Sequence, residues 1–105
     1  MAELEKDIEK RLAKRVREEL GGRAYKFVSP GNDGVPDRIV FLPNGETWFV
    51  ELKAERGKLT KLQLVQLQRL AALRQRVVVL NGRQEVDRFV NGLKLRLRFY
   101  LRRKA

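Results

Sequence analysis

Three charged residues stand among strongly apolar strand formers in the middle of this chain. Asp37 follows Pro36, and Glu51 and Lys53 lie in the segment WFVELK. A small core normally excludes such charges, so their position needs an explanation. Carboxylate oxygens are ligands for hard cations such as Mg²⁺ and Mn²⁺, and a nearby ammonium can bind a phosphate group. The pattern predicts a divalent-metal site that acts on a phosphodiester.

The segment between these charges has the composition of a β-hairpin. Residues 43–45, Pro-Asn-Gly, fit a three-residue loop with Gly in the left-handed position. That loop places Asp37 directly opposite Glu51, where two like charges destabilise the sheet unless a cation compensates them. Lys53 falls on the same face by the strand period.

A simpler interpretation competes with the metal site. In it Asp37 only caps a turn after Pro36, and Glu51 and Lys53 form a solvated ion pair on an edge strand. The apolar run Trp48-Phe49-Val50 favours a core strand over an edge strand. Together with the loop glycines before Asp37, which allow a nucleic-acid backbone to approach closely, it favours the metal site.

Composition narrows the available chemistry. The 105 residues contain no Cys and no His, which excludes disulfides, zinc knuckles, iron–sulfur clusters, thiol nucleophiles and histidine bases. Carboxylate, lysine and hydroxyl chemistry remain. We find no secretory signal and no apolar run of the roughly 20 residues that a transmembrane helix needs, so we expect a cytoplasmic protein with no membrane partner.

The net charge of +11 is concentrated in the second half of the chain. Residues 58–105 hold 13 basic and 2 acidic residues, whereas the charges of residues 1–57 balance. Such a basic half is the electrostatic signature of a polyanion binder, and we favour nucleic acid as the partner. Solubility or an acidic protein partner would also account for it.

The order of apolar and turn residues predicts one mixed α/β domain spanning residues 1–105, with a central mixed sheet flanked by helices in the order α-β-β-β-α-β-α. The first three strands should form a meander. The expected helices are residues 2–20, 60–74 and 84–90, and the expected strands are residues 24–29, 38–42, 47–52 and 76–80.

The basic extension from about residue 91 to 105 is ambiguous. Leu93, Leu95, Leu97 and Phe99 alternate with basic residues, which predicts a strand. The same residues, taken at helical spacing, would instead line one side of a helix. We favour the strand.

Three motifs together resemble the VRR-NUC nucleases, and specifically their short, stand-alone phage-type members. The motifs are Gly34-Val35-Pro36-Asp37-Arg38, Phe49-Val50-Glu51-Leu52-Lys53-Ala54 and Leu59-Thr60-Lys61-Leu62-Gln63. The VRR-NUC nucleases belong to the PD-(D/E)xK superfamily. The resemblance runs from about residue 5 to about residue 90, and it implies a restriction-endonuclease-like core.

The resemblance also implies roles for individual residues. Asp37, Glu51 and the backbone carbonyl of Leu52 would bind the metal. Lys53 would orient the attacking water and offset charge on the phosphate; neighbouring carboxylates keep it charged, so electrostatic stabilisation suits it better than general base catalysis. Gln63 would support the site from the next helix.

Two of these roles have structural alternatives. The family has a glutamate on the first helix that binds the metal directly or through water. Glu5 falls in the apolar stripe of this helix and fits that role better than Glu9. Either acid could instead simply stabilise the start of the helix. Gln63 also completes a capping box with Thr60, which would turn it back to the backbone. Both interpretations of Gln63 remain open.

These observations predict a divalent-metal-dependent DNA endonuclease that responds to DNA structure, such as a junction, flap or nick, in phage replication, repair or recombination. The family implies a homodimer. A non-catalytic nucleic-acid-binding module and a small protein that binds an acidic partner are the alternatives. The residues expected to contact DNA are Lys26, Ser29, Arg38, Lys58 and Lys61.

Overall fold

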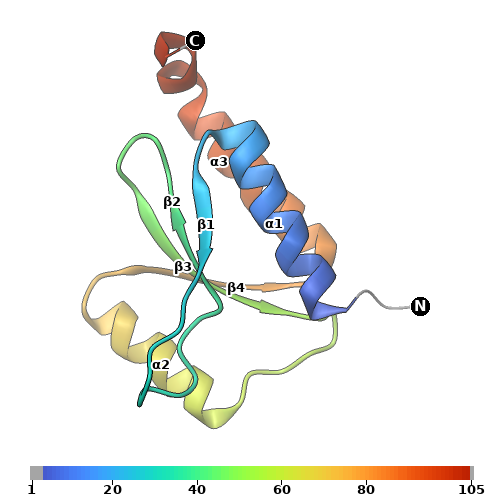
Figure 1. Cartoon of the computed structure of the whole chain (residues 1–105), viewed down its shortest axis with the longest axis vertical. Helices are drawn as coiled ribbons and strands as arrows, with labels where there is room; N and C mark the ends of the chain where they lie inside the picture. Colours follow the sequence, from blue (N-terminus) through green and yellow to red (C-terminus); the bar gives the residue numbers. More distant parts are fainter. Residues whose placement is uncertain (1–3, 105) are drawn as a thin grey trace.

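A computed structural model describes the backbone of residues 4–104 and the side chains of residues 4–101. The elements follow the order α-β-β-β-α-β-α (Figure 1). The helices and strands are α1 (Glu5–Leu20), β1 (Arg23–Lys26), β2 (Arg38–Phe41), β3 (Thr47–Lys53), α2 (Lys61–Ala72), β4 (Arg76–Asn81) and α3 (Gly82–Lys104).

The four strands form one mixed sheet in the order β1-β2-β3-β4. The first three strands pair antiparallel as the predicted meander, and β4 pairs parallel to β3 after the crossover through α2. The predicted hairpin register is confirmed, because Ile39 pairs with Phe49 and Phe41 with Thr47. Residues 43–45 form the loop, in which Gly45 has a φ of 92°. This register is what brings the end of β3 next to the residue that precedes β2.

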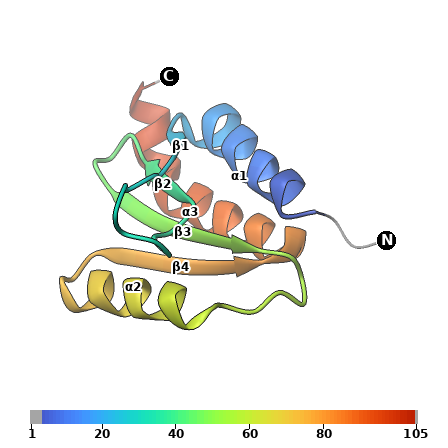
Figure 2. The ribbon, with the colours of Figure 1, turned by 60° about the horizontal axis from the view of Figure 1, so that its bottom comes forward.

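Helices α1 and α3 cover one face of the sheet, and α2 lies beside β4 (Figure 2). The apolar stripe of α1, Ile8, Leu12, Val16 and Leu20, is buried as the sequence predicts. Gly21 ends α1 in the left-handed conformation, which glycine adopts without strain. From the strands, Val40, Val50 and Leu52 complete this core.

The extension from residue 91 is a helix, and the predicted strand is wrong. Leu93 and Leu97 are buried, whereas Leu95 and Phe99 are more than half exposed. The helical period therefore prevails over the alternation, because the leucines four residues apart pack against α1 and the sheet. The short helix expected over residues 84–90 is the first part of this longer helix, whose last turns extend past the sheet (Figure 1).

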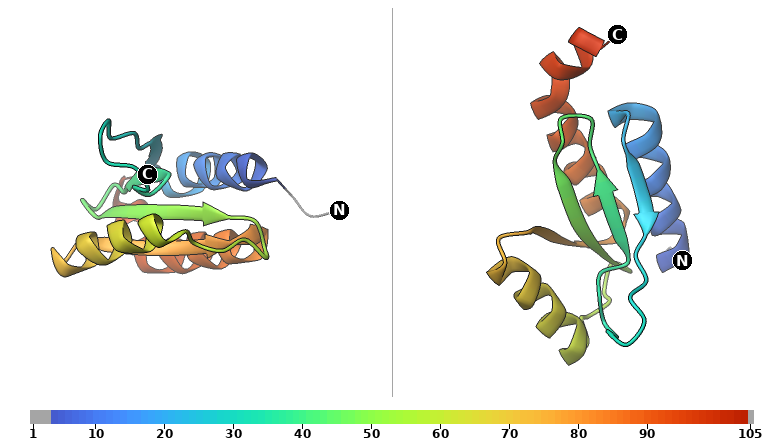
Figure 3. Two further views of the ribbon diagram at one scale, coloured as in Figure 1. Left: turned by 90° about the horizontal axis from the view of Figure 1, so that it is seen from below. Right: turned by 60° about the vertical axis from the view of Figure 1, so that its left-hand side comes forward.

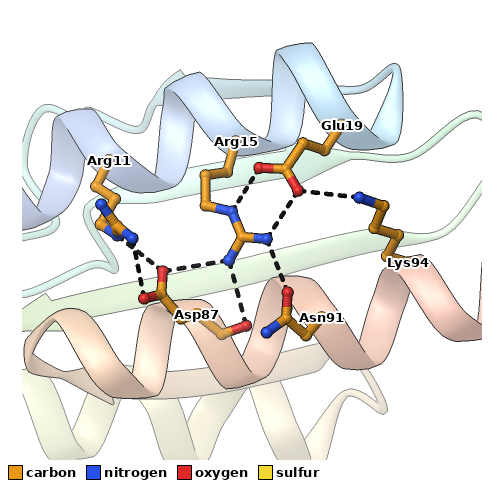
Figure 4. A network of polar contacts seen from close by, with 6 residues as sticks. All are labelled: Arg11, Arg15, Glu19, Asp87, Asn91 and Lys94. Carbon is orange, nitrogen blue, oxygen red and sulfur yellow. Dashed lines mark hydrogen bonds and ion pairs between the residues drawn. The ribbon is translucent and has the colours of Figure 1, made fainter.

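A polar network joins α1 to α3 on the surface of this helical layer (Figure 4). Arg11 donates two hydrogen bonds to Asp87, of 2.7 and 3.0 Å, and Arg15 bonds Asp87, Glu19 and Asn91. The hydrogen bond from Arg15 lowers the pKa of Glu19 to about 2. The network fixes the position of α1, which in turn places its first turn at the edge of the sheet.

Candidate active site

Glu51 occupies an unusual environment on the face of β3 that points away from α1 and α3. Strand alternation directs Val50 and Leu52 into the core and Glu51 to the other face. The Glu51 residue is only 1% exposed, and neither of its carboxylate oxygens has a hydrogen-bond partner among the described residues. A buried charge without a partner is costly, so this carboxyl group must either hold a proton or face a cation.

Asp37 lies beside Glu51, as the predicted hairpin register requires. Its Oδ2 accepts a hydrogen bond of 2.9 Å from the backbone N–H of Leu52. This bond fixes the Asp37 carboxylate against the end of β3.

The pKa of Glu51 reflects this environment. Burial, followed by repulsion from Asp37, raises the pKa of Glu51 to about 7, while the charge of Lys53 opposes the rise. The carboxyl group therefore holds its proton to a higher pH than an ordinary glutamate does. A cation placed between the two carboxylates would favour the ionised form of both.

Lys53 brings a positive charge to the same place. Its Nζ lies 3.8 Å from Glu51 Oε2 and 3.8 Å from Glu5 Oε1, and its side chain is only 12% exposed. Lys53 therefore links the end of β3 with the first turn of α1.

The structure distinguishes the two glutamates of α1. Glu5 is half exposed rather than buried with the apolar stripe of α1, and it reaches Lys53 at the edge of the site. Glu9 accepts a 2.6 Å hydrogen bond from Arg38 Nε and lies 3.6 Å from Lys26 Nζ. Glu9 is thus part of an ion-pair cluster beside β1 and β2, and Glu5 is the α1 glutamate next to Lys53.

Gln63 forms a capping box with Thr60 at the start of α2. Its side-chain oxygen accepts a hydrogen bond from the Thr60 backbone N–H at 2.9 Å, and the Thr60 hydroxyl accepts one from the Gln63 N–H at 3.1 Å. Gly34 packs against the backbone of Leu62 and Gln63, where a side chain would collide. The structural alternative for Gln63 is therefore the one observed.

The residues expected to contact DNA differ in their exposure and in the partners that they already have. Arg38 is largely buried and bonds Glu9 and the Ala24 carbonyl, which leaves it little capacity for phosphate. Lys26 is two-thirds exposed, and Ser29 accepts a hydrogen bond from Asn32 within the loop before β2. Lys58 and Lys61 are exposed before and at the start of α2.

Asn81 is a supporting residue that the sequence analysis missed. It pairs with Lys53 across the parallel strands, and its side chain donates hydrogen bonds to the carbonyls of Ala54, at 3.2 Å, and Gly57, at 2.8 Å. These bonds hold the turn that follows Lys53. The Asn81-Gly82 dipeptide directly after a buried strand was the available sequence signal.

The donor set fits a divalent cation that prefers oxygen ligands. Two carboxylates lie side by side, and the two Glu51 oxygens, which accept no hydrogen bond from the described residues, are available to coordinate a cation. Across residues 4–104 no three Asp or Glu side chains gather closely enough to hold one ion together. Any ion here would therefore depend on Asp37, Glu51, backbone oxygen and water.

Comparison with known proteins finds relatives that cover most of the chain. The family model of the VRR-NUC domain matches residues 2–84. "Putative nuclease p44" of Acyrthosiphon pisum secondary endosymbiont phage 1 is 55% identical over 78 residues, which cover 74% of this chain and 83% of that protein. A solved structure of a VRR-NUC domain superposes with a TM-score of 0.74 at 34% identity, over 83% of this chain and 94% of its own.

Proposed function

The chain belongs to the VRR-NUC domain family, a nuclease family, and from that premise we propose that it is a divalent-metal-dependent endonuclease that hydrolyses phosphodiester bonds in DNA. The observation that carries the proposal is the buried Glu51 carboxyl group, which has no hydrogen-bond partner among the described residues and lies beside Asp37 and Lys53. Such an arrangement costs stability, and a bound cation would offset that cost.

Asp37, Glu51 and the Leu52 carbonyl would hold Mg²⁺ or Mn²⁺, with Glu5 contributing directly or through water. The bound ion would polarise the phosphoryl oxygen and lower the pKa of a water molecule. The Leu52 N–H orients Asp37, since it donates to Oδ2. Lys53, held between Glu51 and Glu5, offsets the negative charge that develops on the phosphate in the transition state.

DNA binding would rely on the basic half of the chain. Lys26, Lys58 and Lys61 are exposed and suited to phosphate contacts, and Ser29 lies in the loop before β2. Contacts of this type position DNA without reading its sequence, so affinity should fall steeply as salt is added.

The substrate and the assembly extend this proposal. A domain of this size covers little DNA, and a homodimer would present two active sites to the two strands of a duplex or junction. The likeness to the phage protein supports a role in phage DNA replication, repair or recombination in the host cytoplasm. Among the described helices, none has both the length and the apolar character needed to cross a bilayer.

Cleavage of labelled DNA tests the proposal. The substrates are duplex, nicked, flapped and four-way-junction DNA, incubated with the wild type or Glu51→Ala in Mg²⁺, Mn²⁺ or EDTA. We expect metal-dependent cleavage by the wild type, with a preference among these structures, and none by Glu51→Ala. Salt-sensitive binding without cleavage of any substrate would contradict the nuclease and favour a non-catalytic binding module.

A further inference from the structure

Aromatic side chains lie on the same sheet face as the reactive carboxylates. Directly paired residues point to the same side of a sheet, and the pairing places Tyr25, Ile39 and Phe49 in one row across β1, β2 and β3. Phe41 pairs with Arg23 and Thr47 and forms a second row on the same face. This outer row lies farther from Glu51. We call Tyr25, Phe27, Phe41 and Phe49 the aromatic track.

The aromatic track leads towards the site along the strands. Tyr25 contacts Phe41 edge-on with ring centroids 5.9 Å apart, and the rings of Phe27 and Phe49 lie 5.8 Å apart. Glu51 follows Phe49 by two residues on β3, a step of about 7 Å. Phe41, at the far end of the track, pairs with Thr47, which is four residues before Glu51 on β3. Along the strands the far end is therefore about 14 Å from Glu51.

The track is accessible over β1 and β2. Tyr25 is 57% exposed and Phe41 is 42% exposed. The helices α1 and α3 pack on the opposite face, where Ala24, Val40 and Val50 are buried. In the right-hand view of Figure 3, no described helix crosses in front of β1 and β2.

The chemistry of this surface matches unpaired nucleobases. Exposed rings stack on bases of any sequence, but the bases of an intact duplex are already stacked on each other. Exposed Arg23 shares the outer row with Phe41 and can contact phosphate. On this surface a second copy of the chain is a poorer occupant, because it would bring its own exposed Arg23 close to the first one.

We propose that the aromatic track binds the unpaired bases of a DNA strand that leads to Glu51, so that the preferred substrate carries a single-stranded arm. The expected effect of the track on cleavage rests on the proposed nuclease function. Its binding outcome is independent of cleavage, since stacking needs neither the metal nor an intact carboxylate pair.

The binding test compares the wild type with the double variant Tyr25→Leu/Phe41→Leu, which keeps apolar side chains and removes two rings. The control is Phe99→Ala, which removes an aromatic ring that is 61% exposed on α3, away from the track. Anisotropy of labelled oligo-dT, oligo-U and a blunt hairpin duplex is measured without metal. We expect the double variant to bind oligo-dT about tenfold more weakly or worse, with duplex binding unchanged and Phe99→Ala like the wild type.

The cleavage test uses one duplex, blunt or with a single-stranded arm, in Mn²⁺. We expect the wild type to prefer the armed duplex by about tenfold and the double variant to lose that preference. If ring-dependent oligo-dT binding occurs without cleavage of any DNA, the nuclease proposal fails and the track stands. If the wild type cuts both duplexes equally and the double variant binds oligo-dT normally, the track fails and the nuclease stands.

Two further results would overturn the track. Tighter wild-type binding to oligo-U than to oligo-dT would assign the surface to RNA. Sedimentation that shows a wild-type dimer and a monomeric double variant would assign the surface to contact between two copies of the chain.

Discussion

Two buried glutamates lie at opposite ends of β3, and their surroundings differ sharply. Glu46, just before the strand, is 8% exposed and accepts hydrogen bonds from Asn44 and Arg96, with Arg76 3.4 Å away. Glu51, near the end, is 1% exposed and has no hydrogen-bond partner among the described residues. Among the described residues, hydrogen bonds therefore satisfy Glu46, whereas Glu51 has no hydrogen bond and lies 3.8 Å from the Lys53 ammonium.

The pKa values move in opposite directions for this reason. Burial alone would raise the pKa of Glu46, but hydrogen bonds from Asn44 and Arg96 and the charges of Arg96 and Arg76 hold it below its ordinary value. For Glu51, burial and the charge of Asp37 act together, and the pKa rises to about 7. We therefore expect Glu46 to stabilise the fold and Glu51 to be available for a ligand.

The largest expected difference between the two acids is in cleavage. Glu51→Gln should lower the rate of metal-dependent DNA cleavage by at least about a hundredfold, because a neutral amide is a poor replacement for a metal-binding carboxylate. Glu46→Gln, its matched control, should stay within a few fold of the wild type in the same gel assay. Equal losses in the two variants would remove the functional distinction.

The second difference is in the pH dependence of stability. The Glu51 carboxyl ionises near pH 4.5 in the unfolded chain and near pH 7 in the fold, so the folded state binds more protons between these values. Its contribution to the free energy of unfolding is present below pH 4.5 and falls by about 3 kcal/mol as the pH rises through 7.

Glu51→Gln should lack this decline and be more stable than the wild type at pH 8 without metal. Urea unfolding at several pH values, followed by Trp48 fluorescence, measures both effects. Parallel pH profiles for the wild type and Glu51→Gln would show that the carboxyl group is not perturbed.

The third difference is the stability cost of changing the satisfied acid. Glu46→Gln should lose about 1–2 kcal/mol at pH 7, because it removes the charge that Arg96 and Arg76 face; both arginines are more than half exposed, which limits the loss. Since the folded pKa of Glu46 is lowered, this contribution exists above the unfolded pKa and disappears as the pH falls through the folded pKa. Unfolding at pH 7 and in acid checks it; an unchanged difference in acid would contradict it.

The smallest expected effect extends the comparison to Gln63. Gln63→Ala should cost about 0.5–1 kcal/mol of stability through the capping box and leave cleavage within a few fold of the wild type. Thermal unfolding and the cleavage assay separate the two. A large loss of cleavage with normal stability would return Gln63 to the catalytic site.

Local patterns in the sequence were enough to predict the carboxylate pair. The Pro-Asn-Gly loop fixes the register of β2 against β3, and that register places Asp37 beside Glu51. Strand alternation then puts Lys53 on the same face. These relations span only a hairpin, where turn geometry determines which residues meet.

Features that depend on distant residues could not be predicted in this way. The burial of Glu46 depends on Arg96, which reaches it from α3. The Arg11 and Arg15 contacts with Asp87 likewise need α1 and α3 to be adjacent. The tail alternates like a strand, and only packing against α1 and the sheet selects the helix.

Binding of the cation itself tests the central claim most directly. Thermal unfolding of the wild type, Glu46→Gln and Glu51→Gln is followed at pH 7.5 with and without excess Mn²⁺. A ligand that binds only the folded state at about a hundred times its Kd adds about 2.7 kcal/mol of stability. We predict that Mn²⁺ raises the Tm of the wild type and of Glu46→Gln and leaves that of Glu51→Gln unchanged. An equal shift in all three proteins, or none in the wild type, would contradict a cation site at Glu51.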